Sequence, residues 1–269
     1  MRQLTYLASI VLIGCTTHAH ATTVSPIETK VTAADAALGD YFGLSVALSG
    51  TTTIVGAYAD DDAGSDSGSA YLFDTTTNNQ IAKLTAADAA GSDFFGYSVA
   101  ISGTTAIVGA YGDADAGGAS GSAYLFDTTT GNQIAKLTAD DAAGGDRFGY
   151  SVALSGTTAI VGAYADDDAG FFSGSAYLFD TTTGNQIAKL TAADAAQYDY
   201  FGISVALSGT TAIVGAYGDD DAGSSSGSAY LYSGVAAPAP VPLPAGVWML
   251  AAALGLIGGM RRLQRSRAA

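Results

Sequence analysis

The sequence has very few of the residues that crosslink small exported domains or bind transition metals. Its 269 residues include one cysteine, Cys15, and two histidines, His18 and His20, all near the N-terminus. If that segment is removed, the rest of the chain cannot form a disulfide, and it is poorly equipped for zinc, copper or iron. Its stability must therefore come from packing.

Positive charge and proline are scarce as well. The chain carries 10 Lys and Arg against 25 Asp and Glu, a net charge of −15 and a pI of about 4.1. Phosphates repel so anionic a chain, which makes nucleic acid an unsuitable partner. Five prolines beside 35 glycines, with 48% hydrophobic residues, indicate packed strands joined by tight turns.

The N-terminus is typical of a secretory signal peptide, residues 1–21. Arg2 precedes an apolar stretch from Leu4 to Gly14, and an Ala-His-Ala site ends at Ala21, where we expect cleavage. The alternative is a lipoprotein signal in which Cys15 is lipidated. Both interpretations predict export.

The C-terminus has three parts in sequence: a Pro/Ala linker at 234–244, an apolar run at 245–260, and four arginines before residue 269. The run is slightly shorter than the roughly 20 residues that span a bilayer, and the arginines fit a positive-inside stop. We predict a transmembrane helix with an Arg-rich tail over 245–269.

This C-terminal order resembles the PEP-CTERM sorting tail, in its VPLPA variant, of Gram-negative bacteria that secrete exopolysaccharide. The motif is Val241, Pro242, Leu243, Pro244 and Ala245. The resemblance implies an exosortase-type enzyme as a partner. It also implies anchoring in the inner membrane before processing, and then release to the cell surface or extracellular matrix.

Between the two ends, one sequence motif occurs four times. The pair Phe-Gly recurs at Phe42, Phe95, Phe148 and Phe201, with a constant spacing of 53 residues. A fixed period of this length is typical of repeat architectures and propellers. We number the repeats 1 to 4, at 30–82, 83–135, 136–188 and 189–232.

The sequence pattern of each repeat predicts four short strands, which is the number in a propeller blade. In repeat 2 the expected strands are 97–102, 105–111, 122–127 and 133–138, separated by Gly-, Asp- and Thr-rich turns. Repeat 4 ends after its third strand, and the segment from Ile27 aligns with the segment from Gln80, so that Lys30 matches Lys83.

We therefore predict an all-β, four-bladed β-propeller over residues 25–233, in which the N-terminal strand completes the last blade. Closure would remove the exposed sheet edges that favour aggregation. The alternative is an open stack that pairs with a second chain to form a larger ring. Four lysines recur in the predicted fourth strands, where we expect outer-edge charges that discourage pairing: Lys30, Lys83, Lys136 and Lys189.

These units resemble the bacterial FG-GAP repeat, related to the repeats of integrin α-chains. Phe42-Gly43 supplies the Phe-Gly pair, and Gly56-Ala57-Tyr58 stands where the family has Gly-Ala-Pro. The resemblance implies propeller blades, although integrin-type rings usually have seven. That family's calcium-binding DxDxDG cage lies between the two motifs, and here the segment contains no acid, so the family site cannot be transferred.

The acids lie in two of the four connections of each repeat. In an up-and-down blade, the second-to-third and fourth-to-first connections emerge on one face, which collects 21 of the 24 aspartates. Ca²⁺ takes six to eight oxygen ligands in flexible loops, so it is a possible cofactor. The alternative is that the acids cap turns and maintain solubility. The candidate metal ligands are Asp60, Asp61, Asp62, Asp113, Asp115, Asp166, Asp167, Asp168, Asp219, Asp220 and Asp221.

A few residues of repeats 3 and 4 depart from the repeat on that same face. Phe171 and Phe172 interrupt one acidic loop, Arg147 is the only arginine of the repeats, and Tyr198 and Tyr200 make the following loop aromatic. We expect these five residues to contact a ligand, because exposed aromatics beside carboxylates stack on sugars or anchor proteins. Alternatively, they fold inward and fill a gap.

These features favour a non-enzymatic adhesion or binding protein, with exopolysaccharide or a surface protein as its partner. One alternative is a polysaccharide hydrolase that uses paired aspartates. Near-identical repeats supply equivalent acids, however, whereas catalysis needs acids with different pKa values. The other alternative is a purely structural matrix protein.

Overall fold

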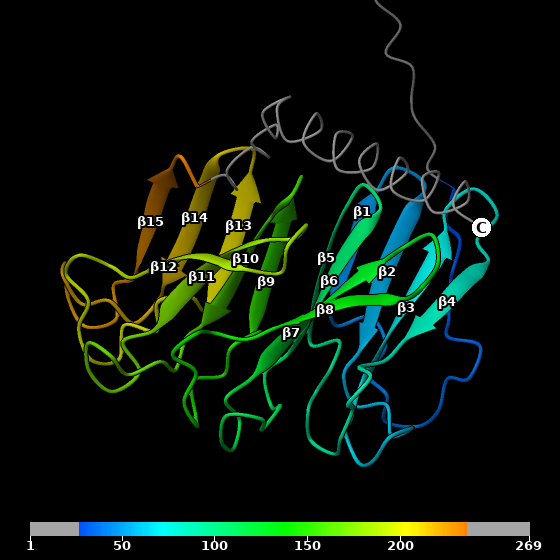
Figure 1. Ribbon diagram of the computed structural model, residues 1–269, viewed down its shortest axis with the longest axis horizontal. Coiled ribbons are helices and arrows are strands. Elements are labelled where there is room, and N and C mark those ends of the chain that lie inside the picture. Colours follow the sequence, from blue (N-terminus) through cyan, green and yellow to red (C-terminus); the bar gives the residue numbers. More distant parts are fainter. Residues whose placement is uncertain (1–26, 236–269) are drawn as a thin grey trace, which may run out of the picture. The chain divides into compact units, whose positions relative to one another are not determined.

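The computed structural model describes residues 27–235 (Figure 1). Contacts divide the chain into Met1–Lys30 and Val31–Ala269. The predicted signal peptide, the VPLPA motif and the predicted membrane helix lie outside the described residues. Within residues 27–235, no helix is long and apolar enough to cross a membrane.

Fifteen strands form four antiparallel sheets, one for each repeat (Figure 1). Sheet 1 contains β1 (Val46–Ser49), β2 (Thr52–Ala57), β3 (Ser69–Asp74) and β4 (Gln80–Leu84). Sheet 2 contains β5 (Ser98–Ser102), β6 (Thr105–Ala110), β7 (Ser122–Asp127) and β8 (Gln133–Leu137). Sheet 3 contains β9 (Ser151–Ser155), β10 (Thr158–Ala163), β11 (Ser175–Asp180) and β12 (Gln186–Leu190). Sheet 4 contains β13 (Ser204–Ser208), β14 (Thr211–Ala216) and β15 (Ser228–Ser233).

Turn chemistry explains why each repeat folds in this way. Gly50 lies at the first position of the two-residue turn between β1 and β2, with φ of 58°, a value that a hairpin of this length requires. Asp74 closes the turn after β3 by accepting the backbone N–H groups of Thr76 and Thr77 at 2.7 and 3.0 Å. The four-strand repeat is thus confirmed in repeats 1 to 3.

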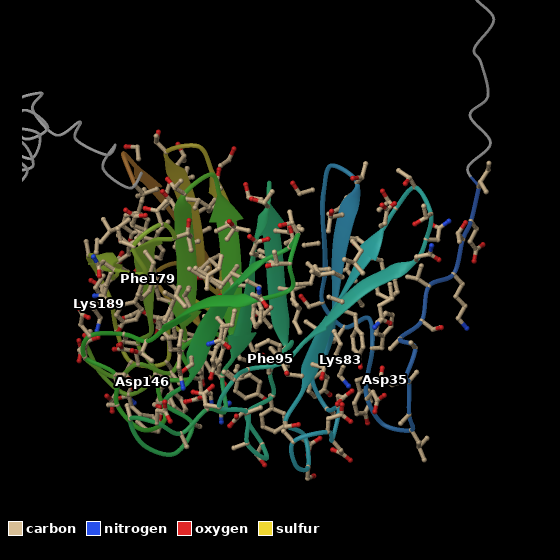
Figure 2. All side chains as sticks on the ribbon, turned by 45° about the vertical axis from the view of Figure 1, so that its right-hand side comes forward. Asp35, Lys83, Phe95, Asp146, Phe179 and Lys189 are labelled. Carbon is tan, nitrogen blue, oxygen red and sulfur yellow. The ribbon has the colours of Figure 1, made fainter. Side chains whose placement is uncertain are left out.

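Consecutive sheets stack face to face through one recurring interface. Ile54 and Leu72 of sheet 1 pack against Phe95, Tyr124 and Phe126 of repeat 2, and all five are almost fully buried. Equivalent residues join sheets 2 and 3, and sheets 3 and 4. We call the surface of a sheet that carries Ile54 and Leu72, or their equivalents, its Ile/Leu face. The opposite surface, which carries the equivalents of Tyr124 and Phe126, is its Phe/Tyr face. Phe95, labelled in Figure 2, belongs to the first of these interfaces.

The prediction that the N-terminal strand closes the last blade is wrong for this structure. Sheet 4 has three strands, in the order β13-β14-β15, and residues 27–32 form no strand. Val31 and Ala33 instead pack in the cluster of Tyr71 and Phe73, on the Phe/Tyr face of sheet 1. No hydrophobic cluster of residues 31–235 joins sheets 1 and 4. The four sheets are consistent with propeller blades, and their stack is open.

Candidate functional site

Three carboxylates converge in every repeat. One comes from the connection that enters the sheet and two from the loop between its second and third strands, as the predicted topology requires. In each group, oxygens from all three side chains lie within 4.8 Å of one another. The triads are Asp35, Asp60 and Asp62; Asp88, Asp113 and Asp115; Asp141, Asp166 and Asp168; and Asp194, Asp219 and Asp221.

The structure therefore brings together eight of the eleven predicted metal ligands. Asp61, Asp167 and Asp220 are exposed and belong to no triad. The four acids that complete the triads, Asp35, Asp88, Asp141 and Asp194, were not among the candidates. Their repeat spacing of 53 residues, shared with the loop acids, was the signal that could have found them.

A lysine fills each of the first three triads. The Nζ of Lys83, on β4, donates to Asp35 at 2.7 Å and to Asp60 at 3.0 Å, and it also pairs with Asp62. Figure 2 labels Lys83 and Asp35. Lys136, on β8 of sheet 2, and Lys189, on β12 of sheet 3, make the same three contacts with the second and third triads. The prediction that these lysines are outer-edge charges is wrong: only about a fifth of each side chain is exposed, 19% for Lys83.

A tyrosine completes each network. The hydroxyl of Tyr71 donates to Asp60 at 2.9 Å, and the Lys83 Nζ lies 5.3 Å from the Tyr71 ring centroid. Hydrogen bonds from Lys83 hold the pKa of Asp35 below its usual value. Burial raises the pKa of Asp60, but hydrogen bonds from Lys83 and Tyr71 outweigh it and lower this pKa too. These carboxylates therefore stay ionised in weak acid.

The fourth triad has no lysine, because repeat 4 ends before its fourth strand. The Tyr230 hydroxyl donates to Asp194 at 3.0 Å and to Asp219, and no ion pair to the triad is present among residues 27–235. The negative charges of Asp219 and Asp194 raise the pKa of Asp221. Three oxygen-donating side chains without a counter-charge fit a hard divalent cation such as Ca²⁺, whereas the other three triads already hold an ammonium.

A second set of aspartates accepts hydrogen bonds from backbone N–H groups. Asp146 is 6% exposed and accepts the N–H of Ala143 at 2.7 Å. Its pKa rises to about 6, chiefly because burial disfavours the charged form. Each repeat has such a residue, bonded to the backbone three positions earlier: Asp40, Asp93, Asp146 and Asp199. For these acids, the alternative prediction of turn capping is confirmed.

Three aromatic residues that depart from the repeat, Phe171, Phe172 and Tyr198, form a cluster with Tyr200 and Tyr217. The Tyr200–Tyr217 pair itself belongs to the repeat, because Tyr41–Tyr58 and Phe94–Tyr111 stack in the same way. Phe171 stacks on Phe172, with ring centroids 4.1 Å apart, and Tyr198 lies 5.7 Å from Phe171. Tyr200 lies 5.7 Å from Phe172 and stacks on Tyr217 at 4.9 Å. We call these five residues the aromatic cluster. Because Phe171 is 50% and Tyr198 45% exposed, the cluster does not fold inward to fill a gap.

Arg147 adjoins the aromatic cluster through Tyr164. Its guanidinium lies 5.5 Å from the Tyr164 ring centroid and donates to the Tyr164 hydroxyl, and Tyr164 lies 6.1 Å from Tyr200. Sequence reasoning missed a row of tyrosines that continues the cluster into repeat 2, through Tyr150, Tyr111 and Tyr97. The tyrosine that replaces proline in the Gly-Ala-Pro motif was the available signal.

Several residues of this region have left-handed backbone conformations that are uncommon outside glycine. Phe172, Tyr198 and Tyr200 have φ of 58°, 68° and 57°, and Arg147 has φ of 57°. Bulky residues at such angles are strained, and strain of this kind persists where the surrounding structure fixes it. The backbone therefore presents these side chains in a fixed arrangement.

The FG-GAP repeat family model matches residues 27–73, 79–126, 132–179 and 185–232, which is most of the chain. No curated protein matches the sequence. Among solved structures, the computationally designed Ika4 protein matches with 13% sequence identity and a TM-score of 0.49, over 77% of this chain and 99% of that one. Each match contains the first three strands of one sheet, and the second, third and fourth matches begin with the last strand of the preceding sheet. Because the matches cover more than half of its residues, the chain belongs to the FG-GAP repeat family.

Proposed function

We propose that this chain is a non-enzymatic binding protein of the cell surface or extracellular matrix, which contacts exopolysaccharide through the aromatic cluster. The observation that carries the proposal is that the fold does not require Phe171 and Phe172, the most distinctive part of the cluster. Where repeat 3 has Phe171-Phe172, repeat 1 has Ser65-Asp66 and repeat 2 has Gly118-Ala119, and the loops fold alike. Half-exposed aromatic side chains that the fold does not need favour a ligand.

The chemistry around the cluster suits a sugar. Aromatic faces pack against the apolar faces of pyranose rings, while the neighbouring carboxylates accept hydrogen bonds from hydroxyl groups. Asp167 and Asp168, a few residues before Phe171, are both exposed. The net charge of −15 disfavours strongly anionic polymers, so we expect a neutral or weakly charged polysaccharide.

The proposed location rests on the sequence outside the described residues. Residues 1–21 favour export, and the VPLPA tail favours inner-membrane anchoring, processing by an exosortase-type enzyme, and delivery to the surface or matrix of a Gram-negative bacterium. A polysaccharide ligand agrees with that destination.

Calcium enters the proposal at one site. Lysines satisfy the triads of repeats 1 to 3, so the fourth triad, Asp194, Asp219 and Asp221, is the one suited to Ca²⁺ in a single chain. In a chain with no partner on sheet 4, calcium would then stabilise the end of the stack rather than organise the whole acidic face.

Affinity electrophoresis in gels containing dextran, a neutral polysaccharide, tests the binding proposal. We expect dextran to retard the protein, and the double variant F171A/F172A to lose at least tenfold in affinity. The matched control is Ile134→Ala, which removes an apolar side chain of similar exposure, 52%, from β8. If dextran and other neutral glucans retard neither protein, the structural-matrix alternative is favoured.

The hydrolase alternative finds less support in the site. Asp146, whose pKa is raised to about 6 chiefly by burial, is a capping residue with counterparts in the other repeats. The triad acids are tied to lysine and tyrosine. Release of reducing sugar from a polysaccharide, abolished by Asp146→Asn, would favour an enzyme.

A further inference from the structure

The two ends of the stack expose apolar surfaces that are buried elsewhere in the fold. On the Ile/Leu face of sheet 4, Ile213 is 40% and Leu231 74% exposed. On the Phe/Tyr face of sheet 1, Val46 is 64% and Leu48 65% exposed. Shallow hollows between β13, β14 and β15 follow this face of sheet 4. Apolar patches of this kind mark interaction surfaces.

The two exposed faces are the unmatched halves of the interface that joins every other pair of sheets. Ile213 and Leu231 occupy the positions of Ile54 and Leu72, which are fully buried against sheet 2. Val46 occupies the position of Val99, which is 7% exposed at that same interface. Each end of the stack therefore carries a surface complementary to the other end.

At Gly215, the backbone of sheet 4 also leaves room for the close approach of another sheet. At the equivalent Gly56, Gly109 and Gly162, an added Cβ would lie 1.9 to 2.0 Å from a carbonyl oxygen of the next repeat, so only glycine fits. Gly215 has no next repeat in the chain, and the nearest atom to an added Cβ is Oγ of Ser204 in its own sheet. The space for an approaching backbone is nevertheless present.

The fourth triad lacks one part that the N-terminal segment contains. Lys83 reaches the first triad from β4, where it lies opposite Tyr71. In the same register Lys30, 53 residues earlier, would lie opposite Tyr230, and its ammonium would reach Asp194, Asp219 and Asp221. Residues 27–31 would then form the missing fourth strand beside β15, which is an edge of sheet 4 within residues 27–235.

We propose that a second copy of this chain docks on these faces. The Phe/Tyr face of sheet 1 of one copy covers the Ile/Leu face of sheet 4 of the other. The N-terminal segment completes the neighbouring sheet, and Lys30 completes its triad. Two copies make two equal interfaces and close a ring of eight sheets.

A second copy fits better than closure within one chain. The three internal interfaces use equivalent residues in equivalent registers, so each turns the next sheet by about the same angle. Three such steps do not bring sheets 1 and 4 of residues 31–235 into contact. Closure within one chain would distort three close-packed interfaces, whereas a second copy repeats them unchanged.

A disulfide placed across the proposed strand pair identifies the occupant. Leu72 lies opposite Ala82 in sheet 1, and the equivalent pair is Leu231 and Thr29. The full chain carrying Thr29→Cys and Leu231→Cys, with Cys15→Ser, is made in cells and run on non-reducing gels. We expect most of it to migrate at twice the mass of one chain. A disulfide within one chain, a longer ladder, or no disulfide would overturn the proposal.

Two controls keep the result independent of folding. Thr29→Cys with Ser204→Cys places the second thiol on β13, the opposite edge of sheet 4, and should give no crosslink. Leu231→Asp, at a site exposed in the single chain, should halve the particle mass measured by light scattering on the full chain in detergent, whereas Ile134→Asp on β8 should not. An unchanged mass for Leu231→Asp would contradict the docking.

Discussion

At the scale of single residues, the central feature is the lysine that lies between three aspartates. Removing Lys136 leaves three carboxylates facing one another without a counter-charge. Because the lysine is mostly buried but two of the acids are half-exposed, we expect Lys136→Met to lower the free energy of unfolding by about 2 kcal/mol at pH 7. Thermal and urea denaturation measure this loss. The control Asp167→Asn changes the net charge by one at an exposed position and should be nearly neutral.

The loss of unfolding free energy in Lys136→Met should depend on pH in a defined direction. Burial raises the pKa of Asp88, but the hydrogen bond from Lys136 outweighs it, and the folded pKa lies below the ordinary value of 3.8. The stabilisation from this pair is therefore fully present above pH 3.8 and is lost as the pH falls through the folded pKa. The difference in the free energy of unfolding between wild type and Lys136→Met should become smaller below pH 4. A gap that widens in acid would show that the lysine does not act through the carboxylates.

The sequence placed most of these residues correctly but assigned the lysines a wrong role. Repeat spacing and blade topology predicted which loops meet, and those loops do supply the triads. The contact of Lys83 with Asp35 and Asp60 spans 48 and 23 residues and depends on the register of β4 against β3. Neither periodicity nor composition defines that register.

At the scale of elements, the close approach of neighbouring sheets determines the stack. An added Cβ on Gly109 would lie 1.9 Å from the carbonyl oxygen of Gly149, although the backbone at Gly109 has no positive φ. Gly109→Ala must therefore push sheets 2 and 3 apart, at a cost of about 3 kcal/mol. Gly118→Ala is the matched control, because nothing lies within 4 Å of its added Cβ. Equal melting temperatures for the two variants would contradict this packing.

The strands themselves could be predicted closely from the sequence. The expected strand at 122–127 matches β7, and the expected strand at 105–111 ends one residue after β6. Alternation and turn residues such as Gly103 specify these boundaries locally. Closure of the ring could not be predicted in this way, because it depends on the angle between stacked sheets. That angle arises from packed side chains such as Phe95 and Leu72.

At the scale of the whole molecule, four equivalent repeats give one acidic face with an unequal end. The first three triads each contact a lysine on the fourth strand of their sheet, and the triad of sheet 4, which has three strands, has no lysine among the described residues. The same end carries the aromatic cluster and an uncovered apolar face.

Calcium stoichiometry tests this account most directly. Isothermal titration calorimetry of the Leu231→Asp variant, which keeps the chain single, should report one Ca²⁺ per chain. Asp219→Asn in that background should abolish the site, and Asp113→Asn, in a triad already filled by Lys136, should leave it unchanged. Four sites per chain, no site, or one site that survives Asp219→Asn would contradict the account.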